Sequence, residues 1–142
     1  MAEPRVVVTT GAGLRTDVRV RGHQVIADEP PAAGGTDTGP SPYELLIASL
    51  AACTSVTARM YADRKGWALD GIEVRVWHQR TNEADPAAPD SRPVQIDSFD
   101  VEVRFSGALD PEQRTRLLEI AGRCPVKRTL LGQVRINTRL AS

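Results

Sequence analysis

The chain has 142 residues, enough for one ordinary domain around one hydrophobic core. Its 18 Lys and Arg residues balance 18 Asp and Glu residues, so no basic surplus points to a nucleic-acid partner. No uninterrupted apolar run reaches the roughly 18 residues of a membrane span, and the first residues lack the apolar segment of a secretion signal. We therefore expect a cytoplasmic protein that binds neither nucleic acid nor membrane.

The first 27 residues predict two or three antiparallel strands. Apolar and polar residues alternate on both sides of the turn-forming segment Gly11–Gly13, and the alternation resumes after a second turn at Gly22. Residues 28–40 are rich in Pro, Gly and Asp, which is typical of a loop.

A long helix is predicted from Pro42 to about Lys65. Ser41 and Glu44 have the spacing of a capping box around Pro42, and Gly66 fits the end of the helix. The first half of this segment is apolar on every side, and a helix that is apolar all round is buried all round. Because one small domain rarely surrounds a helix alone, we expect a second copy of the chain to cover its far side in a homodimer.

The rest of the chain predicts an α+β fold, with one domain spanning residues 1–142 and no internal repeat. The predicted elements are strands at residues 72–77 and 101–105, a polar loop at 80–93 between them, helices starting at Pro111 and Pro125, and a final strand at 134–140.

The only two cysteines, Cys53 and Cys124, would carry any thiol chemistry. Cys53 lies in the apolar half of the long helix, where a free cysteine is often a small core residue. Cys124 precedes Pro125 at a predicted helix start, where unpaired backbone N–H groups favour a thiolate. Each cysteine can thus be structural or reactive. Two cysteines and two histidines, all far apart, do not make a zinc site.

Four other side chains have a structural and a functional interpretation. Glu44 is explained by the capping box, but it could also orient an arginine near a thiol. Arg15 is a candidate for that arginine, or a surface charge on a strand. His23 and His78 show no orienting partner in the sequence, so we favour a structural role for both.

Two segments together resemble one family. Gly39–Ser55, GPSPYELLIASLAACTS, resembles the signature helix of the OsmC/Ohr family of organic hydroperoxide reductases, and Cys124-Pro125-Val126 resembles the second-cysteine segment of that family. The loop Asp28–Pro42 is most similar to the OsmC-like subgroup called YhfA-like. The resemblance implies an intertwined α+β homodimer in which antiparallel sheets from both subunits wrap two long, buried central helices.

The resemblance also implies a mechanism. Cys53 would be the peroxidatic cysteine that an organic hydroperoxide oxidises, and Cys124 would resolve it to a disulfide. An external dithiol, of lipoyl type in the peroxide-reducing members, would reduce the disulfide again, with no bound cofactor and no metal. Arg15 and Glu44 would assist by stabilising the Cys53 thiolate.

One departure from the family pattern keeps an alternative open. The family peroxidases place their glutamate directly after the proline that opens the helix, where this chain has Tyr43 and puts Glu44 one residue later. One residue is about 100° around a helix. The alternative is a non-catalytic dimer on the same fold, which binds a small ligand or serves a stress response.

Overall fold

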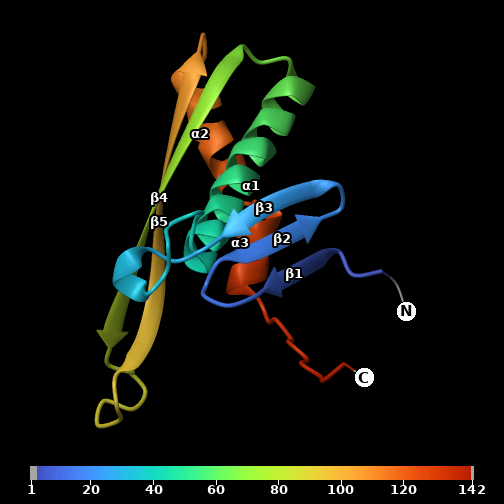
Figure 1. The fold of residues 1–142 in the computed structure, drawn as a ribbon. Helices are drawn as coiled ribbons and strands as arrows, with labels where there is room; N and C mark the ends of the chain where they lie inside the picture. The colour runs from blue at the N-terminus through green and yellow to red at the C-terminus, as the bar shows by residue number, and fades with distance from the viewer. Residues whose placement is uncertain (1–2, 142) are drawn as a thin grey trace. The chain divides into compact units, whose positions relative to one another are not determined.

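The computed structural model describes residues 3–141. The chain divides into a first compact unit that ends at Ala48 and a second that starts at Ser49. The helix α1 (Pro42–Lys65) begins in the first unit and continues into the second (Figure 1). Antiparallel sheets and a long central helix confirm the α+β class, while the single-domain organisation stays a prediction.

The first unit contains a three-stranded antiparallel sheet, which confirms the strands predicted before residue 28. Its strands lie in the order β1 (Val6–Thr10), β2 (Thr16–Val20) and β3 (His23–Ala27). The turn between β1 and β2 places Gly13 at a φ of 83°, a left-handed conformation that glycine adopts without a steric penalty. The predicted loop follows β3 and contains one short 3-10 turn, Pro31–Ala33.

This loop is ordered around the buried carboxylate of Asp28. The Oδ2 atom accepts hydrogen bonds from the hydroxyls of Thr36 at 2.7 Å and Thr38 at 2.6 Å, and Oδ1 accepts one from the Glu29 N–H at 2.8 Å. The backbone N–H of Asp28 donates to the carbonyl of Pro40 at 3.0 Å and closes the loop. The hydrogen bonds from Thr38, followed by Thr36, favour the charged carboxylate and hold the pKa of Asp28 well below its usual range.

We expect Asp28→Asn to lower the melting temperature at pH 7 by about 5 °C or more, because the amide loses the charge-assisted hydrogen bonds. The folded-state pKa lies below the ordinary value of roughly 3.9. The stabilisation is therefore complete above that pH and is lost as the pH falls further. Thermal melts from pH 7 to pH 2 should show the wild-type and variant curves converging at the acid end.

Asp37→Asn is the matched control, because it removes the same charge from an exposed position of the same loop. This variant should have the melting temperature of the wild type. An equal loss of stability in the two variants would contradict the special role of the buried carboxylate.

The start and end of α1 agree with the sequence prediction. The Ser41 N–H donates to Oε1 of Glu44 at 3.3 Å, and the Glu44 N–H donates to Oγ of Ser41 at 3.2 Å, which completes the capping box. The helix ends at Lys65, and Gly66 follows with a φ of 67°. Local capping chemistry therefore determines both ends of this helix.

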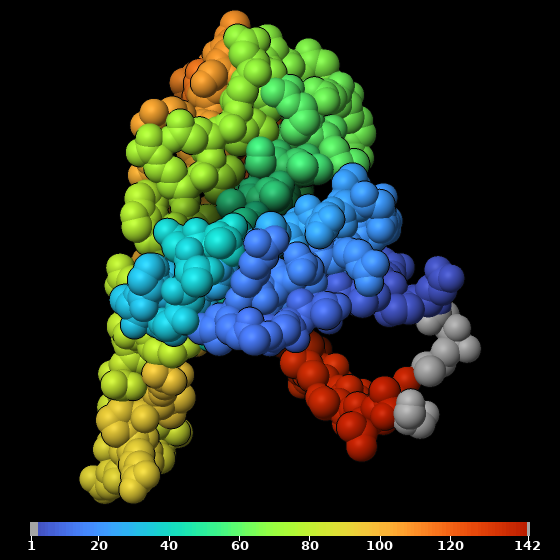
Figure 2. Space-filling model, viewed as in Figure 1, coloured from blue at the N-terminus to red at the C-terminus, as the bar shows by residue number. Residues whose placement is uncertain are grey.

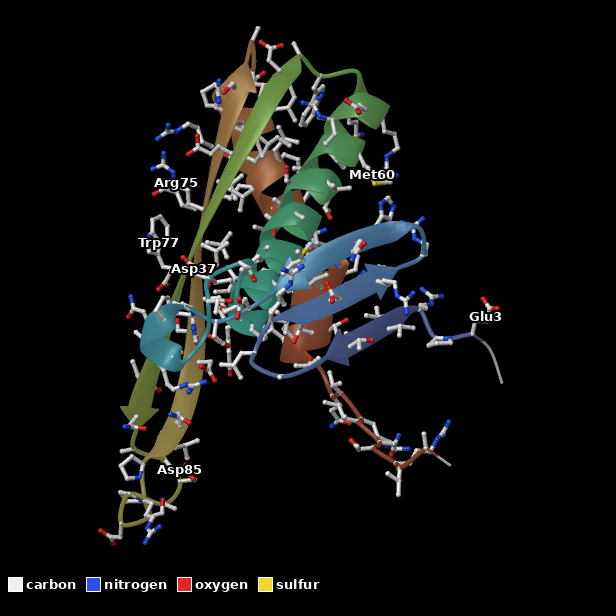
Figure 3. The ribbon with its side chains drawn as sticks, viewed as in Figure 1. Glu3, Asp37, Met60, Arg75, Trp77 and Asp85 are labelled. Carbon is white, nitrogen blue, oxygen red and sulfur yellow. The ribbon has the colours of Figure 1, made fainter. Side chains whose placement is uncertain are left out.

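The prediction that α1 is buried on every side is wrong for the single chain. The buried residues form one stripe at a spacing of four, namely Leu50, Thr54, Ala58 and Ala62. Val56 and Met60 are exposed, and Figure 3 shows Met60 on the side of α1 that faces away from the β4–β5 hairpin. The chain itself thus buries one face of an apolar helix and leaves another face uncovered.

The second unit is built on a long antiparallel hairpin of β4 (Leu69–Glu83) and β5 (Val94–Gly107), followed by α2 (Pro111–Ala121) and α3 (Pro125–Leu131). The C-terminal part of α1 and α2 lie against one face of the hairpin (Figure 1). Arg75 and Trp77 project from its other face (Figure 3). The core lies between the hairpin and the two helices and consists of Ala58, Ala62, Leu69, Phe105, Leu117 and Ala121.

Two sequence predictions in this unit need correction. The strands β4 and β5 extend further than predicted, so the loop between them covers residues 84–93 and not 80–93. The strand predicted at 134–140 is wrong for the single chain, because these residues are extended but pair with no other strand in the described part of the chain. Figure 2 shows this C-terminal segment in red, extending away from the rest of the second unit.

By length and composition, α1 is apolar enough to cross a membrane. The same criteria fit the core helix of a soluble fold. The buried stripe of α1 includes Ala58 and Ala62, which pack with Phe105 of β5 and Leu117 of α2 in the core. We therefore interpret α1 as the core helix of the second unit.

Candidate functional site

Cys53 lies at the edge of the buried stripe of α1. It follows Leu50 by three residues and precedes Thr54 by one, and each residue turns an α-helix by about 100°. The side chain is therefore rotated away from the centre of the stripe, and it is half-buried and unpaired with another sulfur. This position leaves the thiol partly accessible beside the core.

Cys124 is fully buried, with none of its surface exposed. It is the N-cap residue of α3, as the sequence predicted, and its Sγ accepts a hydrogen bond from the Lys127 N–H at 3.3 Å. The hydroxyl oxygen of Thr54 lies 3.8 Å from the same sulfur. Both cysteines are free thiols, one partly accessible and one enclosed.

The contact between Thr54 and Cys124 joins two segments that are 70 residues apart in sequence. Because Thr54 directly follows Cys53 on α1, the buried sulfur lies against the residue next to the accessible one. The structure thus brings the cysteine segment of α1 and the start of α3 together within the second unit.

A cavity of about 610 Å³ lies beside this contact. Thr54 lines it, and so does Lys127, whose backbone N–H bonds to the Cys124 sulfur. The other lining residues are mostly apolar and come from α1, β5, α2 and the end of α3, namely Leu50, Asp97, Ser98, Phe99, Val101, Val103, Leu118, Ala121, Gly122, Leu130 and Leu131. Such a mixture of apolar walls and few polar groups is typical of a small-molecule site.

A cluster on the hairpin was missed by sequence reasoning. His78 Nε2 lies 2.7 Å from Oδ1 of Asp97, and the Nε–H of Arg80 donates to the same oxygen at 3.0 Å. The hydrogen bond from His78, and then that from Arg80, lowers the pKa of Asp97. The sequence showed no partner for His78 because this pairing depends on the register between β4 and β5.

Arg15 and Glu44 both lie in the first unit, whereas both cysteines lie in the second. Arg15 is exposed and forms an ion pair with Asp17, with 3.8 Å between Nη2 and Oδ1. Glu44 caps α1 through Ser41. Their assisting roles at the Cys53 thiol stay predictions. In residues 3–141, no three or more His, Cys, Asp or Glu side chains are grouped as a metal site requires.

The fold and the two cysteine positions define a class of protein: an α+β chain with a cysteine on its central helix and a second cysteine capping a later helix. The chain belongs to the OsmC-like protein family, whose model matches residues 35–139. No curated protein matches the chain by sequence.

Solved structures share the fold at low sequence identity. A Psychrobacter arcticus protein, named for osmotic stress induction and a detoxification response, has a TM-score of 0.71 at 23% identity, covering 91% of this chain and 89% of its own. The OsmC-like protein of Mycoplasma pneumoniae has a TM-score of 0.68 at 17% identity, with 93% and 90% covered. The organic hydroperoxide resistance protein OsmC of Legionella pneumophila has a TM-score of 0.59 at 18% identity, with 93% of each chain covered.

Proposed function

We propose that the chain is a thiol-dependent organic hydroperoxide reductase in which Cys53 is oxidised and Cys124 resolves it. The observation that carries the proposal is the contact between Thr54 and Cys124, which places the enclosed sulfur against the residue next to the accessible cysteine. The name of the Legionella pneumophila relative supports the substrate class.

The first step follows from thiolate chemistry. The Cys53 thiolate attacks one oxygen of the hydroperoxide, the O–O bond breaks, and the departing alkoxide takes a proton to become an alcohol. Cys53 is oxidised by two electrons to a sulfenic acid and the hydroperoxide is reduced by the same two. The partial accessibility of Cys53 suits this role, since the substrate has to reach its sulfur.

The second step forms the disulfide. The Cys124 sulfur attacks the Cys53 sulfenic acid, the S–O bond breaks, and the leaving hydroxide combines with the thiol proton of Cys124 to give water. An external dithiol then exchanges with the disulfide, is itself oxidised to a disulfide, and restores both cysteines. The enclosed position of Cys124 protects its thiol from direct oxidation until Cys53 has reacted.

A thiol titration tests this function. One equivalent of cumene hydroperoxide should remove both free thiols of the purified, reduced protein together, and peptide mass spectrometry should find a bond between Cys53 and Cys124. An equal dose of hydrogen peroxide, applied in parallel, reports selectivity for organic hydroperoxides. Persistence of both thiols under both oxidants would show that the cysteines are core residues.

A second candidate function is binding of a small ligand without thiol chemistry. The cavity of about 610 Å³, with its mainly apolar walls, favours this alternative. It predicts that a variant lacking both cysteines keeps its affinity for ligands found by screening, and loss of binding in that variant would count against it.

We also propose that the active form is a homodimer. Two features of the single chain support it: the exposed apolar face of α1 at Val56 and Met60, and the segment 134–140, which joins neither sheet in residues 3–141. Within that segment the alternate residues Val134, Ile136 and Leu140 are exposed, the last two at 83% and 97%. Apolar surface of this kind is typical of an interface.

A further inference from the structure

We propose that Thr54 is a positioning residue for Cys124, whose hydroxyl orients the sulfur and exchanges hydrogen-bond roles with it as the disulfide forms. This inference rests on the proposed function, in which Cys124 is the resolving cysteine. It assigns a role to a residue that neither donates electrons nor is itself oxidised.

The Thr54 hydroxyl has two neighbours and one proton. Its Oγ1 lies 2.8 Å from the carbonyl oxygen of Leu50 and 3.8 Å from Sγ of Cys124. A hydroxyl donates one hydrogen bond and accepts up to two. While it donates to Leu50, it can accept the S–H of Cys124, and a rotation of the hydroxyl hydrogen alone lets it donate to the sulfur.

The two arrangements match the two states of Cys124. As a thiol, Cys124 accepts the N–H of Lys127 at 3.3 Å. When the single hydroxyl proton of Thr54 goes to the nearer Leu50 carbonyl, at 2.8 Å, Oγ1 is left to accept the S–H of Cys124 across the 3.8 Å contact. When the sulfur gives up its proton to attack the sulfenic acid, Thr54 turns its hydroxyl toward the sulfur and replaces the lost interaction. The carbonyl of Leu50 keeps its helical backbone partner, so the exchange leaves no buried group unpaired.

Thr54 also touches both the sulfur and the cavity. Cys124 has no exposed surface, and Thr54, itself only 4% exposed, is one of the residues that line the cavity. The thiol proton that ends up in water therefore has a hydrogen-bonding group that contacts both the sulfur and the cavity. Thr54 gains and loses no net proton in this step.

Single-turnover kinetics test the role. We expect Thr54→Val to slow conversion of the Cys53 sulfenic acid to the disulfide by about tenfold or more, the equivalent of one hydrogen bond. Oxidation of Cys53 itself should stay at the wild-type rate. Thr54→Ser keeps the hydroxyl and should restore most of the second step. Quenched samples, with the sulfenic acid trapped by dimedone, separate the two steps by mass spectrometry.

Thr57→Val is the matched control. Thr57 makes the same bond one turn later on α1, from its hydroxyl to the carbonyl of Cys53 at 2.7 Å. The Thr57→Val protein should convert the Cys53 sulfenic acid to the disulfide at the wild-type rate. A Thr54→Val protein that resolves as fast as the wild type would overturn the inference, and so would a Thr54→Ser protein as slow as the valine variant.

A second measurement is independent of peroxide chemistry. In a Cys53→Ser protein Cys124 is the only thiol, so its S–H stretching band in a Raman spectrum is unambiguous. We expect Thr54→Val in this background to move the band to higher frequency, and Thr54→Ser to leave it in place. An unmoved band would overturn the inference. Failure of the wild type to oxidise at Cys53 would instead overturn the proposed function.

Discussion

Replacement of Cys53 by serine is expected to reduce peroxide turnover by at least about 10³-fold, because a serine hydroxyl without an activating base is a far weaker nucleophile than a thiolate. Cys124→Ser is expected to behave differently. It should consume one equivalent of hydroperoxide at the wild-type rate and then stop, with Cys53 held as a sulfenic acid. Stopped-flow consumption of cumene hydroperoxide measures both rates.

The control is to identify which cysteine carries the sulfenic acid in each variant. Dimedone should label Cys53 in the Cys124→Ser protein, and no cysteine should be labelled in the Cys53→Ser protein. Labelling of Cys124 in that second protein would reverse the two roles. Equal, full turnover in both variants would remove the cysteines from the reaction altogether.

The helix boundaries could be predicted because they depend on neighbouring residues. The pair Ser41 and Glu44 caps α1, and the pair Asp110 and Gln113 caps α2 in the same way, with the Gln113 N–H donating to Asp110 at 2.8 Å. Each capping box lies within four residues of sequence, so the pattern alone carries the information. The helical start at Cys124 was predictable for the same reason.

The ends of β4 and β5 depend on the pairing between these two strands, and the sequence predicted both strands too short. The alternation of apolar residues in β4 ends near Trp77, yet the strand continues to Glu83 because Arg80 pairs with Asp97 and Asn82 with Gln95. Backbone pairing extends a hairpin beyond the region where one face is apolar. For the same reason the bond between His78 and Asp97 follows from the register and has no local signal.

The candidate site shows the same division between local and distant information. The resemblance around each cysteine singled out Cys53 and Cys124, but no local pattern indicated that Thr54 would contact a sulfur 70 residues later. Threonine in a helix commonly bonds the carbonyl four residues back, which is a sufficient reason for its presence. Only the position of Cys124 beside Thr54 in the fold gives that hydroxyl a second partner.

The absence of strand pairing by segment 134–140 in residues 3–141 leads to the last prediction. The alternation that predicted a strand is present, but the described part of the chain supplies no strand to pair with it. An extended segment with one apolar face gains stability by joining a sheet edge. The first unit offers such an edge at β1, where Val6 and Val8 are exposed. A second copy of the chain can provide that edge.

Ile136→Asp is therefore expected to weaken the proposed homodimer by at least about 100-fold, because the aspartate would place a charge where the proposal buries an aliphatic side chain between subunits. Asn137→Asp adds the same charge at the neighbouring position, whose side chain points to the opposite face of a strand. It should leave the dimer intact. Light scattering across a dilution series measures the dissociation of each protein. A monomeric wild type, or equal dissociation of both variants, would show that this segment does not join the subunits.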